Sequence, residues 1–193
     1  FNFFSADDEH NELRKYLLNN LELHFLPMLN PDGAEKWKRR NDLDIDINRD
    51  ARKQVTPEAR ILMELTQKIK PEFGFNLHDQ STLLSAGASK NPATISFLAP
   101  TYDYARSIND VRRKATQVIL AMNNALQKQI PGKVGKYDDS HDPRYFGDTF
   151  QGMGISTILI ESGGYPQDPE KQYIRKLNFY ALLNAFEAIA SKN

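Results

Sequence analysis

The sequence predicts an α/β fold in which helices cover both faces of one sheet. Apolar segments of strand length alternate along the chain with longer segments whose apolar residues recur at helical spacing. Residues 155–161, Ile-Ser-Thr-Ile-Leu-Ile-Glu, are apolar almost throughout, as strands are when both of their faces are covered. The 193 residues correspond to about one domain, and no repeat or linker interrupts the alternation.

The first part of the chain is expected to contain two helices, one strand and a long loop. Residues 7–20 have helical spacing, and residues 22–28 form a short apolar segment that we predict to be a strand ended by Pro27. A polar loop continues to Thr56, which with Pro57 is typical of the start of a second helix. The apolar face of this helix is expected to contain Ile61, Leu62, Leu65 and Ile69.

The remaining elements continue the alternation of strands and helices. They are predicted as strands at 73–78, 94–99 and 155–161, a long helix over about 103–130, an irregular glycine-rich stretch at 131–154, and a last helix that Asp168 and Pro169 open.

Composition excludes several classes of protein and of site. Lys+Arg and Asp+Glu each total 25, so a net charge of zero gives no electrostatic case for nucleic acid or an anionic membrane as a partner. No apolar run is long enough to span a membrane. The absence of cysteine excludes disulfides, thiolate metal ligands and a cysteine nucleophile. The chain begins at Phe1 without a Met, and we expect a processed or trimmed piece of a longer protein.

Two predicted strands end on a residue capable of chemistry, His78 and Glu161. Ligands of open α/β sheets bind outside the carboxyl ends of the strands. A neutral imidazole at such a position is a potential metal ligand, although a single histidine is more often structural. A buried carboxylate must be paired or have a raised pKa, and a pKa near neutrality suits a general base. The alternative for Glu161 is a cap or a salt bridge.

The loop 30–50 is rich in arginine and asparagine, with Arg39-Arg40-Asn41 followed by Asp46-Ile47-Asn48-Arg49-Asp50. Guanidinium groups bind carboxylates through two hydrogen bonds, so one interpretation is a site for a carboxylate. The other is a solvated loop with local ion pairs. Tyr137 lies in the irregular stretch and is either a mobile phenol or an ordinary surface residue.

Taken in order, these segments resemble the zinc carboxypeptidase family, the carboxypeptidase A-like metallopeptidases. The resemblance extends from about residue 22 to 165. It rests on Pro27–Gly33, on Arg39 with Asn41, on Ile45–Asp50, on Asn76–His78 and on Ile160–Gly163. It implies a three-layer α/β/α fold around a mixed, mostly parallel sheet, as in zinc carboxypeptidases and phosphorylase/hydrolase-like proteins.

The resemblance also implies a catalytic apparatus. It identifies His78 as the third ligand of a Zn²⁺ cofactor and Glu161 as the general base that acts on a metal-activated water. Arg39 corresponds to the arginine that polarises the scissile carbonyl, and Arg40 takes that role if the register shifts by one residue. The implied activity is hydrolysis of the C-terminal peptide bond.

Substrate contacts follow from the same resemblance. Asn48 and Arg49 correspond to the pair that binds the substrate's C-terminal carboxylate, and Tyr137 to the tyrosine that closes over it. The expected partner is a peptide or N-acyl amino acid with a free carboxylate, with no nucleic acid or membrane. Asp148 lies in the stretch that sets side-chain preference, where it either selects basic side chains or is structural.

The chain departs from the family at one point. The family's first two zinc ligands belong to a His-x-x-Glu motif upstream of the Asn-Pro-Asp-Gly turn, and this sequence has none there. We therefore expect residues 1–193 to be a single partial, N-terminally truncated catalytic domain that is inactive alone. Two alternatives remain: a zinc-dependent amide deacylase or cell-wall or side-chain amidase of the same fold, and a metal-free pseudo-enzyme that binds carboxylates.

Overall fold

The computed structural model describes residues 2–80 and 83–191. Within these ranges the chain forms seven α-helices and a four-stranded sheet of order β1-β4-β2-β3. β1 (Phe73–Asp79) runs parallel to β4 (Ser156–Ser162), β2 (Ile95–Leu98) runs parallel to β3 (Val134–Lys136), and β2 and β4 are antiparallel. The predicted α/β class with a mixed, mostly parallel sheet is confirmed.

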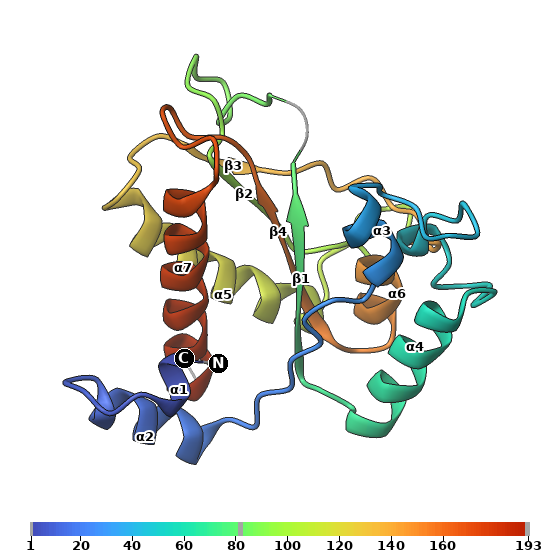
Figure 1. Ribbon diagram of the computed structural model, residues 1–193, viewed down its shortest axis with the longest axis horizontal. Helices are drawn as coiled ribbons and strands as arrows, with labels where there is room; N and C mark the ends of the chain where they lie inside the picture. Colours follow the sequence, from blue (N-terminus) through green and yellow to red (C-terminus); the bar gives the residue numbers. More distant parts are fainter. Residues whose placement is uncertain (1, 81–82, 192–193) are drawn as a thin grey trace.

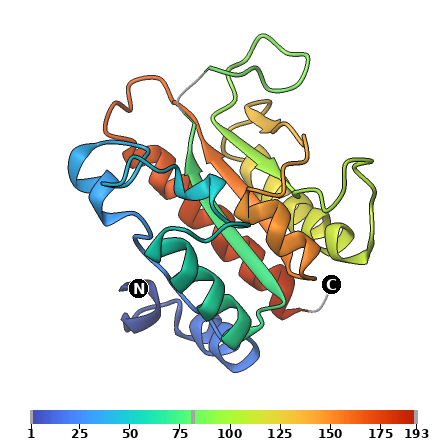
Figure 2. The same cartoon turned by 90° about the vertical axis from the view of Figure 1, so that its right-hand side faces the viewer.

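Helices lie on both sides of this sheet. α5 (Asp110–Gln127) and α7 (Gln172–Ala190) pack together on one side, and α4 (Pro57–Ile69) and α6 (Phe146–Gly152) lie on the other (Figure 1). Figure 2 shows the same arrangement from the α4 side, with α7 behind the sheet. The largest apolar cluster joins Ile158 and Ile160 of β4 to α5 and α7. Since side chains alternate along a strand, Glu161 lies on the opposite face, toward α6.

The predicted strand at 22–28 is wrong. These residues form neither helix nor strand, and Phe25, Leu26 and Met28 are exposed. Apolar composition favoured a strand, but Pro27 lacks a backbone N–H and the segment makes no ladder with β1. The shorter helices α1 (Asn2–Ser5) and α2 (Asn11–Asn20) precede it.

Two stretches predicted as irregular contain regular structure. The long loop before Thr56 contains α3 (Pro31–Lys36) and the 3₁₀ helix η1 (Ile47–Arg49), and the glycine-rich stretch contains β3 and α6. The turn residues themselves start α3, because the Asn30 side chain accepts a hydrogen bond from the Gly33 N–H at 2.9 Å.

The helix after Thr56 is confirmed, but its predicted buried face is wrong in part: Leu62 packs against the core and Ile69 is partly buried, whereas Ile61 and Leu65 are not buried. The Thr56 hydroxyl accepts a hydrogen bond from the Ala59 N–H at 3.2 Å, as an N-cap does. Ile61 and Leu65 are exposed, whereas Ala59 and Met63 pack in a small cluster with Ile47 of η1, Ala51 and Phe146 of α6. α4 thus faces the loop that carries the arginines. In the described part of the chain, no helix is long and apolar enough to cross a membrane.

Gly163, directly after β4, provides a first test of this packing. A Cβ at this position would lie 2.4 Å from the Ala93 carbonyl oxygen, whereas a Cβ at Gly164 would meet nothing within 4 Å. We expect Gly163→Ala to lower the free energy of unfolding by about 1–3 kcal/mol through overpacking, and the matched Gly164→Ala to leave it nearly unchanged. Urea unfolding measures both; equal effects would contradict the close packing at Gly163.

Candidate active site

His78 and Glu161 lie side by side at the carboxyl ends of two neighbouring strands. They are register partners in the parallel pair of β1 and β4, so their side chains project from the same face of the sheet. Glu161 is 7% exposed and His78 is partly buried. The fold thus brings together the two residues that the sequence singled out at strand ends.

Burial determines the protonation of both groups. It raises the pKa of Glu161 from its ordinary value of 4.5 to about 7, an effect that the Arg39 guanidinium opposes and Asp79 reinforces. Burial also lowers the pKa of His78, with Arg39 lowering it further. At neutral pH Glu161 therefore exchanges a proton readily, and His78 is in the neutral form that binds metals.

Arg39 and Arg49 are held beside these two groups by Asp46. The Asp46 carboxylate accepts a hydrogen bond from Arg39 Nε at 2.8 Å and lies 3.8 Å from Arg49 Nη1. It also accepts from the Asn48 N–H at 3.0 Å, which caps η1. Figure 1 shows α3 beside the carboxyl end of β1, the end that carries His78. Asp46 belongs to the predicted arginine- and asparagine-rich motif and had no predicted role in it, although its position at the start of a turn is typical of a cap.

Asn48 and Arg49 are fixed by residues from the start of α6. The Asn48 side-chain oxygen accepts a hydrogen bond from the Phe146 N–H at 3.1 Å, which turns its amide nitrogen toward His78 Nε2 at 3.5 Å. The Arg49 guanidinium lies 4.0 Å from the centre of the Tyr145 ring. No sequence signal pointed to Tyr145, because its contact with Arg49 depends on the tertiary fold.

Tyr137 lies close to the same groups. It follows β3 directly, and its N–H donates to the Phe97 carbonyl at 2.9 Å, so its backbone is tied to the sheet. Burial raises the pKa of its phenol and the Glu161 carboxylate adds to this effect, while Arg39 opposes it. Tyr137, Glu161 and Arg39 are therefore within electrostatic reach of one another.

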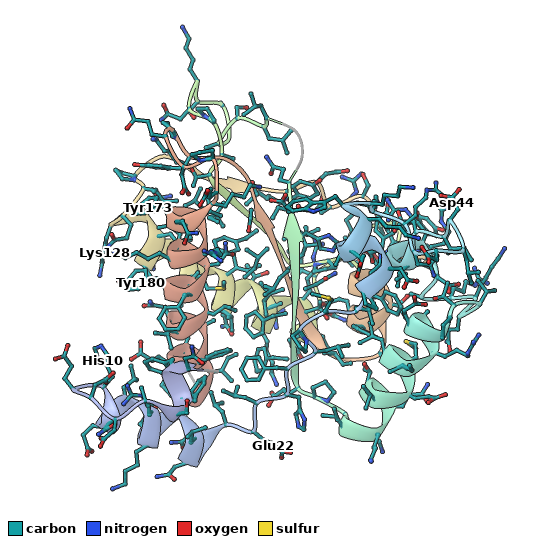
Figure 3. All side chains as sticks on the ribbon, in the orientation of Figure 1. His10, Glu22, Asp44, Lys128, Tyr173 and Tyr180 are labelled. Carbon is teal, nitrogen blue, oxygen red and sulfur yellow. The ribbon has the colours of Figure 1, made fainter. Side chains whose placement is uncertain are left out.

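Two other residues lie apart from this group. Arg40 donates to the Asp44 carbonyl at 2.7 Å, and Figure 3 shows Asp44 at the outer edge of the molecule, away from the strands. Asp148 is 6% exposed, and its carboxylate accepts from the Thr101 hydroxyl at 2.8 Å and lies 3.1 Å from His141 Nδ1. These bonds favour the structural alternative for Asp148 over binding of a basic side chain.

The described residues do not make up a complete metal site. Residues 2–80 and 83–191 contain no group of three His, Asp or Glu side chains placed to hold a metal ion, and His78 is the single imidazole at the strand ends. Two surface hollows of about 480 and 510 Å³ lie elsewhere, next to the carboxyl end of α4 and between α5 and β3. The candidate residues therefore line neither of these two hollows, and they form one site because they interact with one another.

Comparison with known protein families finds no match for this chain, and comparison with curated proteins finds none either.

The two neighbouring arginines provide a test of the grouping. Because the Arg39 guanidinium lowers the pKa of Glu161, we expect Arg39→Met to move that pKa above 7. The matched Arg40→Met is expected to leave it unchanged, since Arg40 bonds to Asp44. Carbon-13 NMR titration of the glutamate carboxyls measures both variants, and equal shifts would contradict the proximity of Arg39 to Glu161.

Proposed function

We propose that this chain supplies the substrate-binding and acid–base residues of a zinc-dependent carboxypeptidase with a three-layer α/β/α, zinc-carboxypeptidase-like fold. The observation that carries the proposal is the pairing of His78 with a buried Glu161 at the strand ends, beside two guanidinium groups. Zinc is the expected cofactor, and His78 would be its ligand from the described residues, which contain no group of three His, Asp or Glu side chains placed to hold a metal ion.

The protein's own groups divide the work as follows. Arg49 and Asn48 bind the carboxylate of the substrate's last residue, which restricts attack to the last peptide bond. Glu161, with a pKa of about 7, takes a proton from the attacking water and passes it to the leaving amine. Arg39 lies where it can stabilise the negative charge that develops on the carbonyl oxygen. Tyr137 covers the bound substrate.

A second candidate function is a metal-free domain that binds carboxylates. The specific observation in its favour is the contrast between two sets of residues. Asn48 and Arg49 are each fixed by neighbouring groups, whereas the described residues offer one imidazole at the strand ends, His78, and no group of three metal ligands. In this case Arg49 and Asn48 bind the ligand and Glu161 does not turn it over. An amide deacylase or side-chain amidase would use the same carboxylate-binding pair.

The test is release of the last residue by the protein that carries this chain, with zinc supplied. The substrates are one peptide as free acid, the same peptide as C-terminal amide, and a set of N-acyl amino acids. We expect turnover of the free-acid peptide and about 10²–10⁴-fold less in Glu161→Gln. Preference for N-acyl amino acids would support the deacylase. Binding without turnover would support the metal-free domain. Equal cleavage of acid and amide would contradict all three.

A further inference from the structure

A buried polar cluster lies between the end of β2 and the first turn of α6. It consists of Thr101, His141 and Asp148, whose exposed fractions are 1% for Thr101, 8% for the His141 side chain and 6% for Asp148. The Thr101 hydroxyl donates to Asp148 Oδ1 at 2.8 Å, and His141 Nδ1 lies 2.9 Å from the hydroxyl and 3.1 Å from the carboxylate. The Tyr104 ring meets His141 edge-on at 4.8 Å.

The geometry of this cluster differs from that of a nucleophilic triad. A relay requires the acid and the hydroxyl to face different ring nitrogens, whereas His141 presents Nδ1 to both. The three groups instead form a closed triangle, in which the Thr101 hydroxyl and His141 Nδ1 both lie within hydrogen-bond distance of the Asp148 carboxylate. Directional bonds of this kind fix the rotation of α6 about its axis and its position along that axis. Apolar packing alone would leave the helix freer to shift.

The segment fixed by the cluster is the one that holds the proposed carboxylate-binding pair. The Ala51 N–H donates to the Arg144 carbonyl at 3.2 Å, the Phe146 N–H donates to the Asn48 side chain, and Tyr145 lies against Arg49. These three contacts join residues 144–146 to η1 and the residues just after it. His141, three residues before this segment, and Asp148, two residues after it, bracket the segment in the chain.

The start of α6 packs closely against Pro100, the residue that precedes Thr101. A Cβ added to Gly147 would lie 3.0 Å from Pro100 Cγ, so the helix backbone approaches Pro100 more closely than an alanine would allow without a shift. Gly147 stands between Phe146, which bonds to Asn48, and Asp148, which bonds to Thr101. The contact with Thr101 and the contact with Asn48 are therefore made by residues that only Gly147 separates in the chain.

We propose that the Thr101–His141–Asp148 cluster is a positioning element that sets the orientation of Asn48 and Arg49 toward a ligand carboxylate. The inference rests on the proposed function in that it assigns the carboxylate to this pair. The three residues of the Thr101–His141–Asp148 cluster touch no ligand, and they act on Asn48 and Arg49 through Tyr145 and Phe146. Loss of the Thr101 hydroxyl lets α6 shift, the Tyr145 ring move relative to the Arg49 guanidinium, and the carboxylate site loosen.

The test compares Thr101→Val, which removes the hydroxyl at equal volume, with Thr101→Ser, which retains it. The probes are N-acetyl-phenylalanine and N-acetyl-phenylalanine amide, titrated by NMR, and the readout is the ratio of their affinities. We expect Thr101→Val to lower the acid-over-amide ratio about tenfold, since a misplacement of about 1 Å costs a positioned site up to about 100-fold. Thr101→Ser is expected to restore the ratio.

A second readout separates failure of the positioning role of the cluster from failure of the proposed function. Because the Arg49 guanidinium lies over the Tyr145 ring, we expect the ring current to shift the Arg49 Hε resonance, and we expect Thr101→Val to move that resonance toward its unstacked position whether or not the ligand binds. A lower Tm in Thr101→Val with an unchanged ratio and an unchanged Arg49 resonance would overturn the inference and leave the proposed function intact. A wild-type ratio of one would overturn the proposed function. If Thr101→Val does not fold, Asp148→Asn is measured in its place and the same outcomes decide.

Discussion

Glu161→Gln is expected to stabilise the folded chain at pH 8 by about 3 kcal/mol while it removes the proposed general base. Burial raises the pKa of Glu161 from 4.5 to about 7, and the residue is 7% exposed. Each tenfold change in proton affinity corresponds to about 1.4 kcal/mol. Because the folded-state pKa lies above the unfolded value, the folded chain binds the proton more tightly. Stability is therefore lost as pH rises from about 4.5 through about 7.

Glutamine is uncharged at every pH and does not incur this cost. Urea unfolding in a chelating buffer measures the difference between wild type and variant. We expect the difference to be largest at pH 8 and to vanish near pH 4, where Glu161 is neutral in both the folded and the unfolded chain. The matched control is Glu64→Gln, a change of an exposed glutamate on α4, which is expected to have little effect at either pH. A destabilised Glu161→Gln at pH 8 would contradict burial as the cause of the raised pKa.

Such a gain in stability on loss of a charged group is typical of functional sites, where the protein retains a costly group for its chemistry. The proposed peptidase activity is expected to change in the opposite direction. If the Glu161 carboxylate instead formed a structural salt bridge, Glu161→Gln would destabilise the folded chain. The sign of the stability change therefore separates the two interpretations of Glu161 that the sequence left open.

The sequence predicted the strand ends well because local composition determines them. The centre of β4, Ile158–Ile160, is apolar, and both His78 and Glu161 follow apolar residues directly, so their placement at carboxyl ends required no tertiary information. The segment 22–28 is also apolar, yet it forms no strand, because a strand needs a partner and composition does not say which partner is available.

The parts of the site that depend on tertiary contacts were not predictable in the same way. Tyr145 and Asp148 lie in a stretch that glycine content marked as irregular, and only the packing of α6 onto Pro100 reveals their contacts. Likewise, the period of α4 predicted Ile61 and Leu65 as buried, but only the neighbouring elements decide which stripe is covered. Sequence identified the ionisable groups, whereas the structure identified what holds them.

Arg49→Met is expected to weaken binding of a ligand carboxylate by about 10- to 100-fold, since a hydrogen bond to a charged group contributes about 1.5–3 kcal/mol. The Arg49 side chain is 35% exposed and is oriented by Asp46 on one side and by the Tyr145 ring on the other. It therefore presents a prearranged fork to an incoming carboxylate. Methionine preserves the aliphatic stem but has no donor.

Two further variants make the measurement specific. Arg49→Lys keeps the charge but lacks the planar fork, and we expect an affinity between those of wild type and Arg49→Met. Arg52→Met removes an exposed arginine from the same loop and is expected to leave the affinity unchanged. NMR titration with N-acetyl-phenylalanine and its amide measures all three. If Arg52→Met and Arg49→Met weakened binding equally, the loop would act through its overall charge, and Arg49 would have no specific place in carboxylate recognition.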